Sequence, residues 1–191
     1  EFKRIIQSAL EEDHALHDIT LKHLKLAKKK LQKPIRAKLV AREAGVLAGC
    51  ASVELAFSIL QKKAQIKWKK NDGQKIVEGQ TLAEIYASAD ALLRIERSVL
   101  NTMQHLSGIA SKTRHCVDAI KHTKVKLLDS RKTMPGLRVL QKYAVKLGGA
   151  ENHRMHLADA IMMKDNHFAM FDNFEEGLLC VKNASKKIKT I

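Results

Sequence analysis

Three short polar clusters in the second half of the chain are rich in cations. They are Asp129-Ser-Arg-Lys-Thr133, Asn152-His-Arg154 and Lys164-Asp-Asn-His167, and the middle cluster follows the turn Gly148-Gly149. Arginine offers a planar fork to a carboxylate or phosphate, and lysine offers a point charge. The pattern is typical of a site for a small anion with several charges, although scattered surface cations would give the same spacing.

Alternating strand and helix patterns predict the elements that would position these clusters. Residues 125–129 and 159–163 are apolar runs of strand length, whereas residues 135–147 and 173–184 have helical spacing. This alternation indicates parallel βα units, whose strands carry active sites at their carboxyl ends. Residues 190–191 would begin a further strand. We therefore expect the clusters to face one mouth of an α/β barrel or open sheet.

The first half of the chain predicts a smaller, separate fold. Residues 2–10 and 53–60 have the spacing of helices. Residues 35–41 and 66–69 alternate apolar and polar side chains, as half-buried strands do. Two strands and two helices in this order indicate a small α/β domain.

A glycine turn pattern and one long helix complete this half. Gly73 and Gly79 lie between strand-like residues, as turn glycines do in small β-sandwiches. Residues 91–121 have continuous helical spacing. Asp90 is the expected N-cap of this helix, and Gly108 is expected to mark a kink or a close packing contact.

Composition narrows the class of protein. The chain has 191 residues, of which 45% are hydrophobic, and a net charge of +15, which attracts polyanions. Its three cysteines form no CxxC pair, which argues against a zinc site and favours reduced thiols in the cytoplasm. No apolar run reaches membrane-spanning length, and no signal-peptide pattern is present. The lysine-rich segments 22–38 and 182–189 are expected to be solvated faces.

Six ordered motifs resemble those of the quinolinate phosphoribosyltransferase family, and the match runs from about residue 13 to residue 167. Each motif alone is weak, but six in register are specific. They are Ala41-Arg-Glu-Ala-Gly-Val-Leu-Ala-Gly49, Glu96-Arg-Ser-Val-Leu-Asn101, Leu106-Ser-Gly-Ile-Ala-Ser111, Asp129-Ser-Arg-Lys-Thr-Met-Pro-Gly-Leu-Arg138, Lys142-Tyr-Ala-Val-Lys146 with Gly148-Gly149, and the pair Asn152-His-Arg154 and Lys164-Asp-Asn-His167. Ser130 stands where the family has threonine, and Ala150 where it has a third glycine.

The resemblance implies an α/β fold with two domains. Residues 1–101 would form an N-terminal α/β sandwich, and residues 102–191 would form part of an α/β barrel. The family's later barrel strands, with acidic residues near the magnesium ion, would lie after Ile191, so we expect the barrel to be incomplete here. We therefore predict that residues 1–191 alone do not turn over substrate at a useful rate.

The resemblance also implies an activity. The family transfers phosphoribosyl from phosphoribosyl pyrophosphate to quinolinate, with Mg²⁺, and releases pyrophosphate and CO2 to give nicotinate mononucleotide for NAD synthesis. A homodimer or higher homo-oligomer in the cytoplasm is implied, since the residue matching Arg97 serves the neighbouring subunit's site. Lys132 and Lys164 match catalytic lysines. The implied substrate-binding residues are Arg97, Ser130, Arg131, Lys132, His153, Arg154 and Lys164, and no metal ligand is expected within this chain.

Plainer roles exist for several of these residues. Arg97 could be an ordinary surface partner on its helix. His167 is expected to cap the next helix or hold its loop, and Asp129 to be a structural carboxylate rather than a metal ligand.

Two other functions stay open from the sequence. A related phosphoribosyltransferase with another acceptor shares some motifs, although Lys164-Asp-Asn-His167 favours the quinolinate branch. A non-catalytic basic protein that binds nucleic acid would also explain the charge. Nucleic acid is the less favoured partner, because no reading-head motif and no interleaved aromatics are present.

Overall fold

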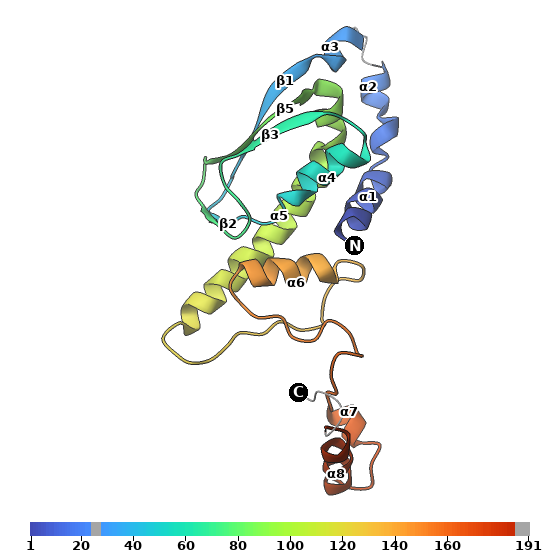
Figure 1. Ribbon diagram of the computed structural model, residues 1–191, viewed down its shortest axis with the longest axis vertical. Coiled ribbons are helices and arrows are strands. Elements are labelled where there is room, and N and C mark those ends of the chain that lie inside the picture. The colour runs from blue at the N-terminus through green and yellow to red at the C-terminus, as the bar shows by residue number, and fades with distance from the viewer. Residues whose placement is uncertain (24–27, 186–191) are drawn as a thin grey trace.

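The structure is a computed structural model that describes residues 1–23 and 28–185 (Figure 1). Helices and short strands alternate along the chain, and no strand longer than an isolated bridge follows residue 88 among the described residues. In chain order the elements are α1 (Phe2–Glu12), η1 (Ala15–His17), α2 (Ile19–His23), α3 (Lys28–Gln32), β1 (Pro34–Val40), β2 (Gly45–Val46), α4 (Ala51–Ile59), β3 (Ala64–Trp68), β4 (Lys75–Ile76), β5 (Thr81–Ser88), α5 (Ala89–Ile120), α6 (Arg138–Leu147), α7 (Asp165–Phe168) and α8 (Phe174–Ser185).

The first half folds as an α/β sandwich, which confirms the predicted class. Strands β1, β5 and β3 form an antiparallel sheet in that order, with Ile66 opposite Ile85. Helices α1, α4 and α5 pack against one another on one side of this sheet (Figure 1). Because side chains alternate along a strand, one face of β5 buries Ile85 and Ala87 against the helices. The short strands β2 and β4 form a second, two-stranded sheet.

The long helix α5 connects the sandwich to the second half of the chain. Its N-cap is Ser88, whose hydroxyl accepts the Ala91 N–H at 3.2 Å, so the prediction that Asp90 is the cap was wrong. Asp90 is instead buried in the first turn, where it pairs with Arg94 at 2.9 Å and Lys62 at 3.4 Å. The predicted packing contact at Gly108 is also wrong, because a Cβ there would meet no described atom within 4 Å.

The second half has the predicted helices but not the predicted strands. Residues 125–129 contribute one isolated parallel bridge, between Leu128 and Glu151, and residues 159–163 form no named strand among the described residues. Parallel strands are stable when they are paired on both sides and covered by helices. Here Val125 is 66% exposed, so the neighbours that would bury such a strand are absent from the described part of the chain. The result is an incomplete α/β barrel with no closed sheet.

Helix boundaries in this half follow ordinary capping rules. Helix α6 begins at Arg138, three residues after Pro135, and ends at Leu147 with Gly148 as its C-cap, after which Gly149 adopts the left-handed conformation with φ +97°. Helix α8 begins after Asn173, whose side chain accepts the Glu176 N–H at 2.9 Å. The strand predicted at residues 190–191 lies outside the described residues.

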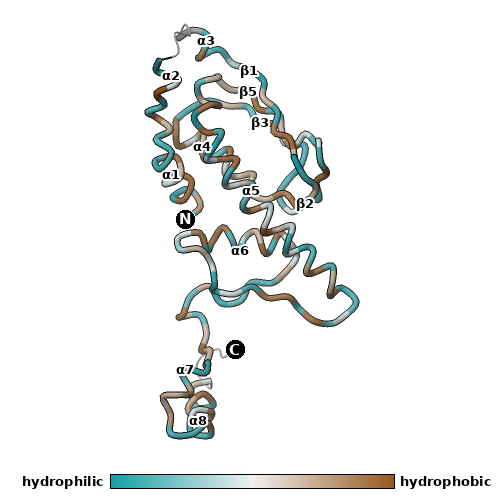
Figure 2. The backbone as a smooth tube through the Cα atoms, turned by 180° about the vertical axis from the view of Figure 1, so that it is seen from behind, coloured by the Kyte–Doolittle hydropathy of each residue, from teal (hydrophilic) through white to brown (hydrophobic). Residues whose placement is uncertain are grey.

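Helices α7 and α8 stand apart from the rest of the chain (Figures 1 and 2). They hold each other through Phe168 and Phe174, whose ring centroids are 4.8 Å apart. Gly177 allows this approach, since a Cβ there would meet the Phe168 ring at 2.7 Å. Leu179 on α8 is 62% exposed. No helix in the described segments is long and apolar enough to cross a membrane.

Candidate active site

Two of the three predicted cationic clusters lie side by side. The parallel bridge between Leu128 and Glu151 aligns the segments that carry them. The Asp129 N–H donates to the Glu151 carbonyl at 3.1 Å, and the Glu151 N–H donates to the Leu127 carbonyl at 2.9 Å. Residues 129–133 therefore leave this bridge in the same direction as residues 152–155. This is the geometry expected at the carboxyl ends of two adjacent parallel strands.

A buried ion pair holds these two segments against α6. The Lys142 ammonium donates to Asp129 Oδ1 and, at 2.9 Å, to the His153 carbonyl. The same Asp129 oxygen accepts the His153 N–H at 2.8 Å. The side chains of Lys142 and Asp129 are only 1% and 6% exposed. A lysine is almost never buried to this extent unless it is paired, so the pair is a defining feature of the site.

Asn152 completes the contacts of the Asp129 carboxylate. One terminus of its side-chain amide lies 3.0 Å from Asp129 Oδ2 and 3.0 Å from the Lys142 carbonyl, and both of those atoms are acceptors. The amide nitrogen therefore occupies this position and donates to both. Asp129 is thus a structural carboxylate, as predicted, with both of its oxygens engaged.

The loop after Asp129 is ordered by its own side chains. The Ser130 hydroxyl accepts the Lys132 N–H at 3.1 Å, and the Thr133 N–H donates to the Arg131 carbonyl at 2.9 Å. Arg138, the first residue of α6, donates to the Thr133 hydroxyl at 3.0 Å and to the Met155 carbonyl at 3.0 Å. This arginine is a second link between the two cationic segments, and sequence analysis assigned it no role.

The predicted substrate-binding cations in these segments have no acidic partner among the described residues. Arg131, Lys132 and the His153 ring form no ion pair there, and Arg154 uses one guanidinium nitrogen on the Ala160 carbonyl at 2.8 Å. The Nε atoms of Arg131 and Arg154 are buried without a hydrogen-bond partner in the described structure. A buried donor left unpaired is unfavourable, and Arg114 on α5 has the same feature, so it is not confined to the proposed substrate cations.

The nearby Asp159 carboxylate is engaged by backbone rather than by these cations. Its Oδ2 accepts the Met155 N–H at 2.7 Å and the His156 N–H at 3.0 Å. The backbone N–H groups of His156 and Met155 hold the pKa of Asp159 below its ordinary value. The carboxylate therefore shapes the loop after Arg154, whose charge also lowers the pKa of Asp159, although the two side chains form no ion pair among the described residues.

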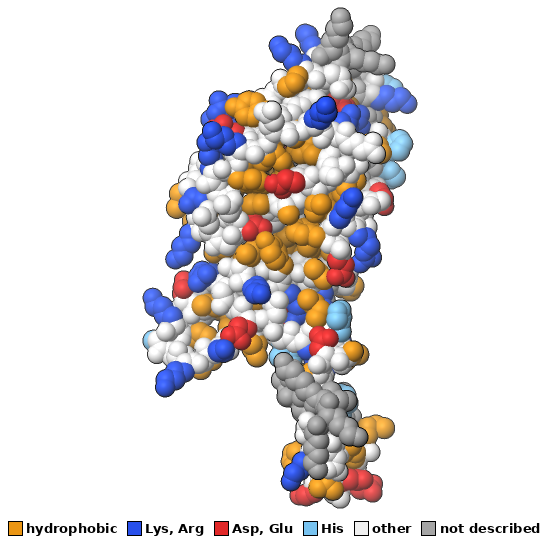
Figure 3. Space-filling view, viewed as in Figure 1, with side chains coloured by type: hydrophobic (Ala, Val, Ile, Leu, Met, Phe, Trp, Pro, Cys, Tyr) orange, Lys and Arg blue, Asp and Glu red, His pale blue; other side chains and the backbone are white. Residues whose placement is uncertain are grey.

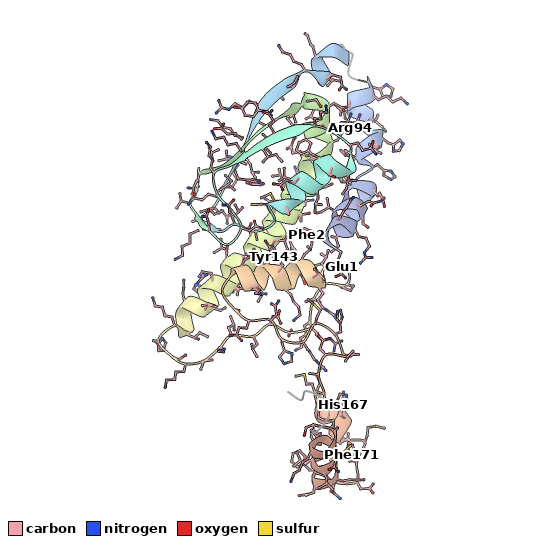
Figure 4. All side chains as sticks on the ribbon, in the orientation of Figure 1. Glu1, Phe2, Arg94, Tyr143, His167 and Phe171 are labelled. Carbon is pink, nitrogen blue, oxygen red and sulfur yellow. The ribbon has the colours of Figure 1, made fainter. Side chains whose placement is uncertain are left out.

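The third cluster is not joined to the other two. Lys164 is exposed and immediately precedes α7, and no hydrogen bond or ion pair among the described residues links it to Arg131 or Arg154. Its own N–H donates to His167 Nδ1 at 3.2 Å, which confirms that His167 caps the following helix (Figure 4). The structure therefore brings together two of the three clusters that were predicted to face one mouth, and no contact among the described residues adds the third.

Arg97 lies away from these cations. It is exposed on α5 at the edge of a hollow of about 350 Å³ between α1, α5 and the start of α6. Glu12 and His105 also line the hollow, and none of residues 129–133 or 152–154 does. The other basic side chains are spread across the visible face rather than gathered in a stripe (Figure 3). Among the described residues, no cluster of three or more His, Cys, Asp or Glu side chains could hold a metal ion.

Comparison with known families assigns both halves of the chain. The family model of the quinolinate phosphoribosyl transferase N-terminal domain matches residues 18–107, and that of its C-terminal domain matches residues 109–191. The two models meet inside α5, which runs through both. The predicted domain boundary at residue 101 stays a prediction.

Among curated proteins, the chain is 47% identical over 133 residues to the "Probable nicotinate-nucleotide pyrophosphorylase [carboxylating]" of Bacillus subtilis (strain 168), covering 70% of this chain and 46% of that protein. It is 40% identical over 159 residues to the Mycobacterium leprae (strain TN) "Nicotinate-nucleotide pyrophosphorylase [carboxylating]", covering 81% and 55%. It is 39% identical over 170 residues to "Quinolinate phosphoribosyltransferase [decarboxylating] 2, mitochondrial" of Nicotiana glauca, covering 88% and 47%. The chain thus spans about half the length of these relatives.

Solved structures share the fold over nearly the whole chain. The nicotinate-nucleotide pyrophosphorylase of Ehrlichia chaffeensis superposes with a TM-score of 0.88 at 36% identity, covering 98% of this chain and 67% of that one. The corresponding protein of Francisella tularensis gives a TM-score of 0.86 at 34% identity, covering 98% and 64%. With both domain models matched in order and the fold shared, the chain belongs to the quinolinate phosphoribosyltransferase family.

Proposed function

We propose that the protein to which this chain belongs transfers phosphoribosyl from phosphoribosyl pyrophosphate to quinolinate, with loss of CO2. The observation that supports this proposal is the pairing of the 129–133 and 152–155 segments around Asp129, because these segments carry Arg131, Lys132, His153 and Arg154. Quinolinate has two adjacent carboxylates on one pyridine ring, so it requires several converging cations. Membership in the family supports the same substrate pair.

The side chains have different roles in this proposal. Arg131 and Arg154 offer planar guanidinium forks to the two carboxylates, and each has a buried Nε–H without a partner among the described residues. Lys132 and Lys164 supply point charges near the reacting atoms. Ser130 and His153 would add hydrogen bonds to the bound anions. Lys164 would complete the site only when the segment before α7 lies against the other two clusters.

The chemistry requires positioning and charge more than a covalent nucleophile. The pyridine nitrogen of quinolinate forms a bond to the anomeric ribose carbon while pyrophosphate leaves with the electrons of the carbon–oxygen bond. The adjacent carboxylate then departs as CO2, and the ring carbon takes up a proton. The cations hold the diacid in line with the ribose and neutralise charge on the leaving side.

Magnesium belongs to this proposal through the family and not through the described residues. Mg²⁺ is commonly held by one or two carboxylates together with substrate phosphates. The Asp129 carboxylate does not fit that role, because Lys142, the His153 N–H and Asn152 engage both of its oxygens. We assign no step of the reaction in this chain to a metal ion.

A homodimer is part of the proposal, because Arg97 is separated from the other cations. It is exposed on α5, beside a hollow that contains none of the Asp129 cluster. We propose that Arg97 completes the site of a second copy. In the complete enzyme, a mixture of R97A and R131Q copies should recover part of the activity that each variant lacks alone. No recovery on mixing would exclude the shared site.

Quinolinate binding tests the proposed substrate. Calorimetry of the 191-residue chain should detect quinolinate at a lower concentration than nicotinate, which has one carboxylate. R131Q and R154Q should each weaken quinolinate binding at least tenfold, which corresponds to about 1.4 kcal/mol. K124M is the matched control, since Lys124 is an exposed lysine just before the Asp129 segment and forms no ion pair among the described residues.

The same measurements separate the alternatives. Equal affinity for nicotinate and quinolinate would favour a relative with another acceptor. Salt-sensitive DNA or RNA binding that quinolinate does not displace would favour a basic binding protein. We also expect no useful turnover by residues 1–191 alone, and measurable turnover would contradict this.

We propose a cytoplasmic location for the protein. All three cysteines are free, which is the state that a reducing compartment maintains. The relative from Nicotiana glauca is named mitochondrial, so the compartment differs within the family. Fractionation of cells that express the complete protein would decide between the two.

A further inference from the structure

The contacts of the buried Lys142–Asp129 pair suggest a function other than stabilising the fold. Taking two charges out of water is unfavourable, and replacing a buried ion pair by apolar residues is often neutral or stabilising. Here the two side chains are 1% and 6% exposed. The pair lies at the point where α6 meets both cationic segments. Folding stability therefore does not explain why the pair lies at this position.

The negative charge of Asp129 would interfere with an anion-binding site. It immediately precedes the Ser130-Arg131-Lys132 turn, and it accepts the N–H of the residue before Arg154. Without another cation, this carboxylate would pair with Arg131, Lys132 or Arg154. It would also repel an incoming diacid. A neighbouring negative charge would thus weaken the site in two ways.

Lys142 prevents both effects by pairing with the Asp129 carboxylate. It extends from α6 and donates to Asp129 Oδ1 and to the His153 carbonyl. Asn152 occupies the other carboxylate oxygen. All of the carboxylate's close partners are therefore groups that no substrate needs. Arg131 and Lys132 form no ion pair within the described residues.

The other carboxylates of these segments follow the same rule. Glu151 pairs with Lys126 at 2.8 Å on the exposed side. Asp159 accepts the backbone N–H groups of Met155 and His156. Each acid of the described 129–133 and 151–159 segments thus has a partner other than the proposed substrate cations.

We propose that Lys142 is the internal counterion of Asp129, a positioning residue that leaves Arg131, Lys132 and Arg154 free for the carboxylates of the substrate and fixes His153 beside them. This inference rests on the proposed function, because it assigns those cations to a diacid. It adds a residue outside the anion pocket on which the pocket's charge depends. Lys142 itself does not touch the substrate.

A charge-rescue experiment tests the proposal. K142M keeps the length of the side chain but leaves Asp129 unpaired, and it should weaken quinolinate binding to the 191-residue chain at least tenfold. The double variant K142M/D129N removes both charges at nearly constant volume, and it should bind quinolinate within about threefold of the unmodified chain. K124M should bind as the unmodified chain does, because Lys124 is exposed and forms no ion pair among the described residues. Circular dichroism checks that each variant is folded.

A purely structural role predicts a different pattern. If the pair only held the segments together, the double variant would bind as weakly as K142M, and that result would overturn the proposal. Unchanged binding by folded K142M would overturn it as well. If K142M does not fold, the two variants are compared in a stabilised background in which it does, because a pair without any role in binding would also leave the double variant able to bind.

A second measurement does not depend on quinolinate. In a crystal structure of K142M, or of the K142M chain rescued by a stabilising background, the Asp129 carboxylate should pair with Arg131, Lys132 or Arg154. A carboxylate that stays clear of all three would refute the counterion role, whatever the substrate is. Failure of the complete protein to bind quinolinate would instead refute the proposed function, so the two failures are distinguishable.

Discussion

The Tyr143 hydroxyl on α6 donates a 2.7 Å hydrogen bond to Asp72 Oδ2, in the turn before β4, and so connects the barrel half of the chain to the sandwich. The other oxygen of Asp72 accepts the Cys50 N–H at the start of α4, at 3.0 Å. Tyr143 also packs near Phe2 of α1, with ring centroids 6.3 Å apart (Figure 4). One carboxylate thus fixes the start of a sandwich helix and the position of α6.

Removing the Tyr143 hydroxyl should loosen this connection without affecting either core. We expect Y143F to lower the free energy of unfolding by about 0.5–1.5 kcal/mol, the usual net contribution of one hydrogen bond. D72A should cost more, because it also leaves the Cys50 N–H at the helix start without its acceptor. Urea denaturation followed by circular dichroism measures both. An equal effect of the two variants would show that the contact with Cys50 is of no consequence.

The same hydrogen bond predicts a dependence of stability on pH. Burial and the Asp72 carboxylate raise the pKa of Tyr143 above its ordinary value of 10.0. The folded chain therefore holds the phenolic proton more tightly than the unfolded chain does. The resulting stability is fully present below about pH 10 and is lost as the pH rises above it. The difference in melting temperature between the unmodified chain and Y143F should be constant from pH 7 to 9 and shrink above about pH 10. A difference that grew at high pH would contradict this assignment.

Cys50 should have the least reactive thiol of the three cysteines. Burial and the neighbouring Asp72 raise the pKa of Cys50 well above its ordinary value, and the thiolate is the reactive form. Cys180 on α8 is exposed. At pH 8, iodoacetamide should label Cys180 at least tenfold faster than Cys50, as followed by mass spectrometry of the peptides. D72N should accelerate labelling of Cys50 and leave Cys180 unchanged. Equal rates in the unmodified chain would rule out the effect of Asp72.

Local patterns in the sequence predicted most of the helices and the sandwich strands. Periodicity located α1, α4 and α5 within a few residues, because each buries one stripe against a neighbour that is present in this chain. It also located α8, although Gly177 is the only residue that this helix buries among the described residues. The strands predicted at residues 125–129 and 159–163 do not form in the described structure, for the opposite reason. Their stability depends on neighbouring strands, and no local pattern reports whether those neighbours are present.

The cations of the candidate site were proposed from the sequence, but the side chains that hold their segments together were not. Arg131 was proposed from its place after an apolar run, and Arg154 from its place after the turn Gly148-Gly149. Lys142 was quoted only as part of a motif, because a lysine in the middle of a helix is normally solvent-exposed. Its burial follows from α6 being covered on two sides, by α5 and by the cationic segments. Asp72 was missed because its two partners are 22 and 71 residues away in sequence.

Two glycines in helical segments provide a matched pair for testing the packing of α5 against α6. At Gly148 an added Cβ would collide with the Thr113 side chain and lie 2.7 Å from the Ala110 carbonyl oxygen, both on α5. At Gly108, also on α5, it would meet no described atom within 4 Å. G148A should therefore force α6 away from α5 and destabilise the chain by about 1–3 kcal/mol, as overpacking does. G108A should stabilise it by about 0.5–1 kcal/mol, because alanine favours the helix over the unfolded chain. Thermal unfolding of both variants measures the two effects against one reference. A neutral G148A would mean that α5 and α6 are not in the close contact described, whereas a destabilising G108A would reveal a partner that covers the exposed face of α5.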